Sequence, residues 1–166
     1  MPDLSYPLIN GNYSSANSAM IKIAGLQFVG IKSLNYDDDL KPGEVRGLHA
    51  RIVGRTTGIE SAKGDVELYL PEFLQLQAAL KLAALARFGT PAGWKQVEFN
   101  IMSSIGELGG VIAQDELIAC RVTSVAAGLS AGSSDAVTRK CGLSIVNIKW
   151  NGEESLAFPL AGVPFL

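Results

Sequence analysis

Residues Gly30 to Phe73 read GIKSLNYDDDLKPGEVRGLHARIVGRTTGIESAKGDVELYLPEF, and this stretch decides the fold of the chain. It predicts a strand, a long charged loop rich in Gly and Pro at about 37–58, and a second strand that leads into a helix. The stretch holds no metal-ligand spacing, no phosphate loop and no nucleophile paired with a base. Long loops between strong strands usually carry a function, so we expect this one to contact another chain.

The helix is the clearest element after the loop. Pro71 suits a first helical turn, and Glu72 suits the positive end of the helix dipole. Apolar residues then follow the helical period, and Gly89 with Pro91 predicts the end near Phe88. We therefore expect one helix at about 71–88.

Strand patterns dominate the rest of the chain. A short strand and its return are expected around Gly25, and the excursion at 37–58 could form an open β-hairpin of its own. The expected strands are residues 20–24, 26–36, 62–70, 94–104, 114–125 and 137–150. This order predicts a mainly β fold, a β-sandwich or partly closed barrel with one flanking α-helix.

Length and composition predict a single domain covering 1–166, with an N-terminal arm at 1–18 and an apolar C-terminal tail at 153–166. The chain is 48% apolar and only 18% charged, which allows a core and leaves a thinly charged surface. Such a surface suggests buried contacts between subunits. The net charge of −2 argues against a general nucleic-acid binder. It does not exclude a pore through which nucleic acid passes.

No apolar run reaches the ~18 residues that a membrane-spanning helix needs. The opening MPDLSYPLINGNYSS lacks the basic and apolar regions of a signal peptide. We therefore expect synthesis and assembly in a cytoplasm, without membrane insertion.

Candidate chemical groups are few. His49 is the only histidine, and no cluster of ligands or nucleophile accompanies it, so we interpret it as a surface loop residue. The acidic run Asp37–Asp39 lacks the Ca²⁺-loop pattern and is interpreted as a solvated turn or a partner for a basic patch on another subunit. GELGG and GLSAGSS are interpreted as hairpin turns and not phosphate cradles. We expect no catalytic residue, no cofactor and no metal.

Two questions stay open from the residues alone. Arg46, Arg51 and Arg55 could pair with carboxylates on a stacked copy or could simply be solvated. A hairpin centred on the small-residue loop 128–134 would place Cys120 close to opposite Gly142, so a disulfide to Cys141 is geometrically possible. Reduced buried thiols are the expectation for a chain made in a cytoplasm.

The segments IKIAGLQFVGIKSLNYDDDLKPGEVRG, GRTTGIESAKGDVELYLPEF, LIACRVTSV and LSIVNIKWNG resemble, in this order, the tail tube proteins of tailed bacteriophages. The resemblance covers about 20–152. It implies a β-sandwich or barrel subunit with one helix that forms hexameric rings, which stack into a hollow tube for genome delivery. The tube subunit of type VI secretion shares this fold and is a related possibility.

The resemblance also implies a location in the virion, after assembly in the host bacterial cytoplasm. Its expected partners are further copies of the chain and tail proteins such as a sheath, a baseplate hub or a tail terminator. Genome DNA would pass through without specific binding. Loop length, charge pattern and resemblance together predict the contacts between rings and subunits at Tyr36, Asp38, Lys41, Glu44, Arg46 and Arg55.

Two readings from other classes compete with this one. A β-sandwich binding module of the tail or baseplate would need an exposed aromatic cluster, whereas Trp94 and Trp150 sit at the ends of different predicted strands. A hydrolase would need a base beside a nucleophile, for which His49 is the main candidate. We therefore predict a structural protein without enzymatic activity.

Overall fold

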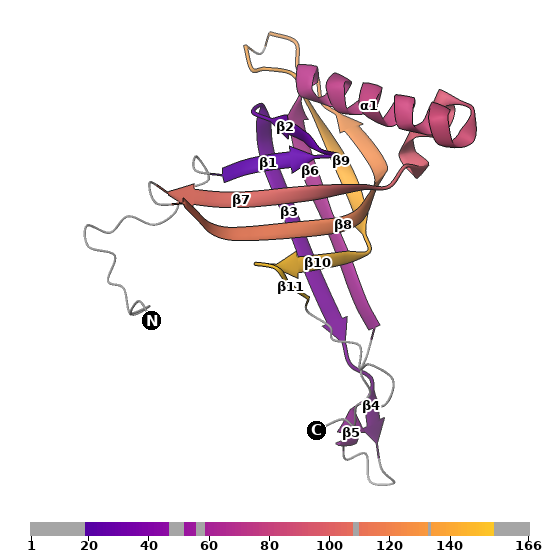
Figure 1. Ribbon diagram of the computed structural model, residues 1–166, viewed down its shortest axis with the longest axis vertical. Helices are drawn as coiled ribbons and strands as arrows, with labels where there is room; N and C mark the ends of the chain where they lie inside the picture. Colours follow the sequence, from indigo (N-terminus) through magenta and orange to yellow (C-terminus); the bar gives the residue numbers. More distant parts are fainter. Residues whose placement is uncertain (1–18, 47–51, 56–58, 108–109, 133, 155–166) are drawn as a thin grey trace.

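The computed structural model describes residues 19–46, 52–55, 59–107, 110–132 and 134–154. Strands dominate this part of the chain, and one long helix follows the sixth strand (Figure 1). The elements, in chain order, are β1 (Ala19–Ile23), β2 (Leu26–Phe28), β3 (Ile31–Lys41), β4 (Glu44–Arg46), β5 (Ile52–Arg55), β6 (Ile59–Tyr69), α1 (Leu70–Phe88), η2 (Pro91–Gln96), β7 (Phe99–Glu107), β8 (Gly110–Ala127), β9 (Thr138–Ile145), β10 (Asn147–Trp150) and β11 (Glu153–Glu154).

The strands form two crossing layers that share β8. One half of β8 pairs with β7 and β10, and β1 and β2 extend this layer beyond β7. The other half pairs with β9, and the order continues through β6 to β3, all antiparallel. In Figure 1, β3, β6 and β9 run along the long axis while β1, β7 and β10 cross them. The predicted class, a mainly β fold (a β-sandwich or partly closed barrel) with one flanking helix, is confirmed, and the described sheet is not closed.

The bend in β8 lies at Ala119, where the chain leaves one layer and enters the other. Ala119 has a φ of 53°, a left-handed backbone conformation that residues other than glycine rarely adopt. Its N–H cannot join the regular ladder and instead donates to Asn100 Oδ1 at 3.0 Å. The ladder between β7 and β8 shifts its register at the same place, between Phe99 and Ile101. The polar contact with Asn100 satisfies the backbone group that the bend releases.

The core fills the space between the two layers. It takes the inward residues of both sheets and one face of α1. The largest fully buried side chains are Ile23, Leu68, Leu76, Leu80, Ile101, Leu117 and Ile148. Cys120 and Cys141 are both buried and free. Cys141 pairs with Val125, and Gly142 pairs with Ser124, so the expected near-opposition of Cys120 and Gly142 is wrong. The hairpin is centred further along the chain because the loop after β8 extends to Val137.

Helix α1 forms where the sequence predicts it. Pro71 stands in its first turn, and Gly89 ends it in the left-handed conformation with its N–H donating to the Leu85 carbonyl at 3.0 Å. Its buried face carries Phe73, Leu76, Leu80 and Ala84, at the spacing of one helical stripe. Figure 1 shows α1 across one end of the crossed layers, opposite the end from which β4 and β5 project.

Several predicted strand boundaries are wrong. The strand expected at 26–36 is divided at Val29 and Gly30, and its two parts enter different layers. The strand at 137–150 is likewise divided at Val146. Residues 91–96 form a 3-10 helix, so the strand expected at 94–104 begins only at Phe99. In each case alternation of apolar residues continued across a change of layer or a turn, and alternation alone does not reveal such a change.

The loop expected at 37–58 is shorter than predicted, because the strands on both sides are longer. Asp37–Asp39 lie inside β3, paired with Ser61 to Lys63, and β6 begins at Ile59. The Asp triplet is therefore not a turn. Between these strands, β4 and β5 form a separate two-stranded sheet, which confirms the expected hairpin within the excursion. The strand β11 also occupies the start of the segment interpreted as a tail.

Candidate assembly interface

The distal hairpin, defined here as β4 and β5, presents charged side chains of both signs. Arg46 Nη2 lies 3.0 Å from Glu44 Oε2, and Lys41 Nζ lies 3.4 Å from Asp39 Oδ2. All four side chains are exposed, so each pair contributes little to stability. Val45 between them is 48% exposed. Lys41, Glu44 and Arg46 are therefore placed where another molecule could contact them.

The side chains of three residues in the predicted loop lie outside the described part of the structure. Arg55 lies in β5 opposite Glu44, but its side chain is outside the described part of the structure. His49 and Arg51 fall outside the described residues altogether. The predictions for these residues remain predictions.

Tyr36 and Asp38, by contrast, point inward from β3. The Tyr36 hydroxyl donates to Asp115 Oδ2 at 2.6 Å, and the Trp150 indole N–H donates to Asp38 Oδ2 at 3.1 Å. Burial, with the neighbouring Asp115 carboxylate, raises the pKa of Tyr36 to about 12. The sequence prediction placed Tyr36 and Asp38 with the charged loop, but the structure places them in an intramolecular cluster.

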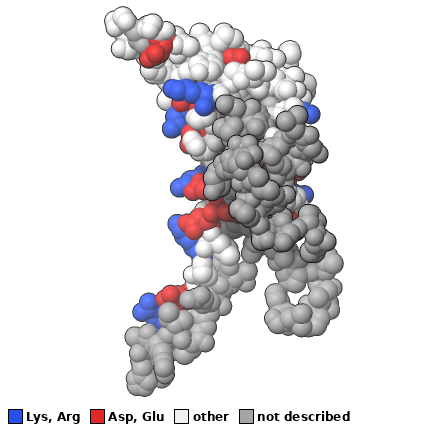
Figure 2. Space-filling view, turned by 90° about the vertical axis from the view of Figure 1, so that its left-hand side faces the viewer, with Lys and Arg blue, Asp and Glu red and all other residues white. Residues whose placement is uncertain are grey.

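The outward face of β3, β6 and β9 is a polar surface with matched charges. Lys63 Nζ lies 3.9 Å from Asp37, Lys140 Nζ lies 3.5 Å from Asp65, and Lys32 Nζ lies 3.1 Å from Glu67. The pKa of Glu67 is lowered, first by the hydroxyl of Thr138 and then by Lys32. Figure 2 shows the two signs intermixed along the left-hand edge of the profile. We call this surface the polar face; every lysine in these three pairs has its own carboxylate.

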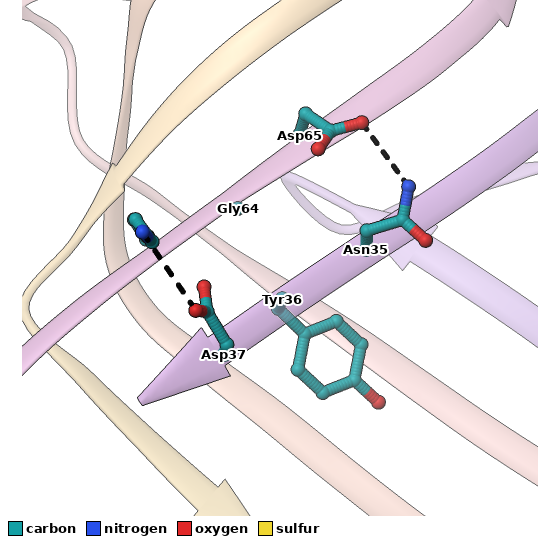
Figure 3. A pocket seen from close by; sticks show the side chains of 6 residues that line it. Asn35, Tyr36, Asp37, Gly64 and Asp65 are labelled. Atoms are coloured by element: carbon teal, nitrogen blue, oxygen red, sulfur yellow. Dashed lines mark hydrogen bonds and ion pairs between the residues drawn. The ribbon is translucent and has the colours of Figure 1, made fainter. Parts of the chain in front are cut away.

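A shallow depression of about 200 Å³ lies on the ladder between β3 and β6 (Figure 3). The Asp37–Lys63 pair borders it on one side, and the hydrogen bond from Asn35 to Asp65, 3.2 Å long, borders it on the other. Gly64 forms its floor. The groups around it are already paired with one another, and the depression is open to solvent, which suits contact better than the binding of a small ligand.

Strands β3 and β8 form the two free edges of the layer that carries the polar face. Among the described strands, β3 pairs only with β6, and β8 pairs only with β9 from Arg121 onward. Three antiparallel steps separate the two edges, so β3 and β8 run in opposite directions. Monomeric proteins usually cover or blunt the free edge strands of a sheet, because an open edge accepts strands from other chains.

Helix α1 carries a second apolar stripe on the side away from the core. Leu74, Leu82 and Leu85 are 52%, 70% and 50% exposed, and Phe88 adds to the same side. Leu82, Leu85 and Phe88 follow one another at a spacing of three, so they are neighbours on one side of the helix, and Leu74 lies about two turns earlier on the same side. A strip of this kind is characteristic of surfaces that contact other proteins.

Within the described residues, no group of three or more His, Cys, Asp or Glu side chains could hold a metal ion. No helix in this part of the chain is long and apolar enough to cross a membrane.

The alternation of polar residues in 32–39 was a usable signal for the polar face. The cluster around Tyr36 was not visible, because Asp115 and Trp150 are remote in sequence.

No protein-family model and no curated protein matches this sequence. Solved structures do match its fold. The chain aligns with a sheath–tube complex of the PVC extracellular contractile injection system in the extended state, with a TM-score of 0.63 and 13% identity over 89% of this chain and 93% of that one. The tube-terminating cap of the anti-feeding prophage aligns with a TM-score of 0.61 and 11% identity, over 90% of this chain and 98% of that one.

A third match is the SPP1 tail tube. The alignment gives a TM-score of 0.53 with 11% identity, over 84% of this chain and 79% of that one. The three alignments each span 79% or more of both chains, at 11–13% sequence identity. The chain therefore has the fold of the tail tube proteins.

Proposed function

We propose that this chain is a non-enzymatic structural subunit of a tail tube, in which copies join edge to edge into a ring and rings stack into a hollow conduit. The observation that carries the proposal is the pair of free edges on one layer. Because β3 and β8 run in opposite directions, β3 of one copy can continue the antiparallel ladder against β8 of the next. Repeating this head-to-tail contact by rotation closes a ring.

The polar face then lines the lumen. A sheet closed into a ring has an inner and an outer surface, and the apolar side of this layer is already buried against the second layer. Lysines on the polar face are matched by carboxylates, so the surface offers no excess of positive charge to a phosphate backbone. Genome DNA would pass such a wall without being held, as delivery through a virion tail requires.

Stacking of rings is assigned to the two ends of the molecule. The distal hairpin projects from one end and α1 crosses the other (Figure 1). A six-membered ring, assembly in the host cytoplasm, and a sheath, baseplate hub or tail terminator as partners are parts of the same proposal. They are supported by the sequence resemblance and by the tube and terminator assemblies among the structural neighbours.

Cross-linking between copies tests the edge-to-edge contact. Each double variant carries one cysteine on β3 and one on β8 at exposed positions, for example Asn35→Cys with Ser124→Cys. Several such pairs sample the possible registers between β3 of one copy and β8 of the next. Paired strands lie about 4.8 Å apart, so facing cysteines fall within the range of a disulfide. Oxidation should give a ladder of covalent oligomers that stops at the ring number, and each single variant alone should give none.

Electron microscopy of the same samples across a concentration series supplies the second measurement. Rings or hollow tubes of uniform width are expected. Particles that remain single subunits at every concentration, with no covalent ladder, would contradict the proposal and favour a binding module of the tail or baseplate. Tubes that form only with type VI secretion components would favour the related secretion role.

A further inference from the structure

A cluster of side chains ties β3 to the crossing layer shortly before β3 ends at Lys41 and the distal hairpin begins at Glu44. Tyr36 donates to Asp115 at 2.6 Å, and Trp150 donates to Asp38 at 3.1 Å. The rings of Tyr36 and Trp150 contact each other, with centroids 5.3 Å apart and planes tilted by 34°. Both hydrogen bonds join a carboxylate to an aromatic donor, and such charge-assisted bonds are among the stronger ones in proteins.

The two layers contribute equally to this cluster. Tyr36 and Asp38 lie on the inward side of β3, opposite Gly64 and Ala62 of β6. Asp115 belongs to β8 and Trp150 ends β10. Asp115 is itself fixed, because its second oxygen accepts the Asn151 N–H at 2.9 Å. The hydrogen bonds therefore join β3 to β8 and to the end of β10, and Asp115 is held in turn by the residue that follows β10.

Beyond this cluster, the described residues give β3 support on one side. After Asp38, β3 continues for three residues as far as Lys41, and the start of β6 is its partner among the described strands. The distal hairpin that follows is a separate two-stranded sheet. Two-stranded ribbons twist more freely than wider sheets and are only marginally stable by themselves. A small rotation at the cluster would therefore become a larger displacement of β4 and β5.

We propose that the Tyr36–Asp115 and Trp150–Asp38 hydrogen bonds form a latch that fixes the direction of the distal hairpin and so controls the stacking of rings. The inference rests on the proposed function and assigns these residues a positioning role inside each subunit. In this role Tyr36 and Asp38 act within the subunit, whereas the sequence predicted them as contacts between rings and subunits. Removing the latch should impair stacking and leave the edge-to-edge contact intact.

The test uses the full chain with Tyr36→Phe and Trp150→Phe combined, which removes both donors and keeps both rings. Trp94→Phe is the matched control, because Trp94 lies in η2, outside the cluster. Asp38→Asn keeps an acceptor for the indole N–H and should behave like the native chain, whereas Asp38→Leu should not. The latch variants should still form rings, with the concentration needed for tubes raised at least tenfold.

A second measurement does not depend on assembly. Spin labels at Val45→Cys and Lys81→Cys report the position of the distal hairpin relative to α1 in the single subunit; Cys120 and Cys141 are buried and should escape labelling. The distribution of distances should be narrow in the native chain and in Trp94→Phe, and broad in the latch variants. A distribution that stays narrow without the latch would overturn the inference.

The two proposals fail separately. Native chains that never associate would contradict the tube function, and the distance distribution would still decide whether the latch orients the hairpin. Tubes that form normally from latch variants would overturn the control of stacking while leaving the tube function intact. A loss of rings in parallel with a loss of folded protein would assign the cluster to stability alone and would also overturn the inference.

Discussion

Gly64 faces Tyr36 in the ladder between β3 and β6, and a Cβ on Gly64 would lie 2.6 Å from the carbonyl oxygen of Asn35. The same Cβ would lie 3.2 Å from Ile145 Cδ1 and 3.3 Å from the backbone of Tyr36. Two of these three neighbours are backbone atoms, which cannot rotate away. The close approach of the two strands therefore requires glycine at this position.

Gly64→Ala should lower the free energy of unfolding by about 1–3 kcal/mol, the usual cost of overpacking a tight site. Gly128→Ala is the matched control, because a Cβ there meets no atom within 4 Å. It should change stability by less than about 0.5 kcal/mol. Denaturant unfolding of both variants checks the prediction, and equal midpoints would contradict it.

Alkaline pH should lower the free energy of unfolding of the native chain, because Tyr36 ionises less readily in the folded state than in the unfolded state. Its pKa is raised by burial and by Asp115 to about 12, above the ordinary value of 10.0. Because the pKa of Tyr36 is higher in the folded than in the unfolded state, its contribution to stability is fully present below pH 10. This contribution is lost as the pH rises from about 10 to 12. Tyr36→Phe should remove this part of the pH dependence. Parallel stability curves for both chains across that range would disprove the assignment.

Replacing the distal hairpin should separate folding from stacking. Lys41 and Ile59 are paired, so an Asn-Gly turn can join them in place of residues 42–58. The shortened chain should fold with native stability, because the removed strands form their own sheet outside the core. It should form rings that do not stack, as seen by electron microscopy. Tubes of normal length would refute the role of the hairpin.

The two cysteines should react slowly in the native chain. Burial raises the pKa of Cys120 to about 12 and that of Cys141 to about 11, so little thiolate is present near pH 8. Native labelling with a thiol reagent should be on the order of 100-fold slower than labelling in denaturant. Mass spectrometry should count two modified thiols after unfolding. A mass two hydrogens lighter before reduction would instead reveal a disulfide.

The sequence was sufficient for the fold class and for α1, because Pro71, Gly89 and the helical period are local signals. It was insufficient for the strand boundaries around Val29 and Val146. At both places the chain passes from one layer to the other, and the apolar pattern continues because both layers bury the same core. A change of layer is a tertiary event and leaves no mark on the local period.

The candidate site shows the same division. The exposed charges Lys41, Glu44 and Arg46 were predictable from a Pro-Gly break and a mixed-charge segment. The inward direction of Asp38 was not, because three consecutive aspartates look alike in sequence. Only the pairing register assigns Asp37 and Asp39 to one face and Asp38 to the other. Its partner Trp150 is 112 residues away along the chain.

The strand β8 belongs to both layers, with its bend at Ala119. Neither layer can detach as a subdomain without pulling apart the ladder of the other. The subunit should accordingly melt in a single all-or-none transition, with no half-folded species in which one layer survives. For a particle built from many copies, such cooperativity would leave each newly made chain either competent to join or plainly unfolded.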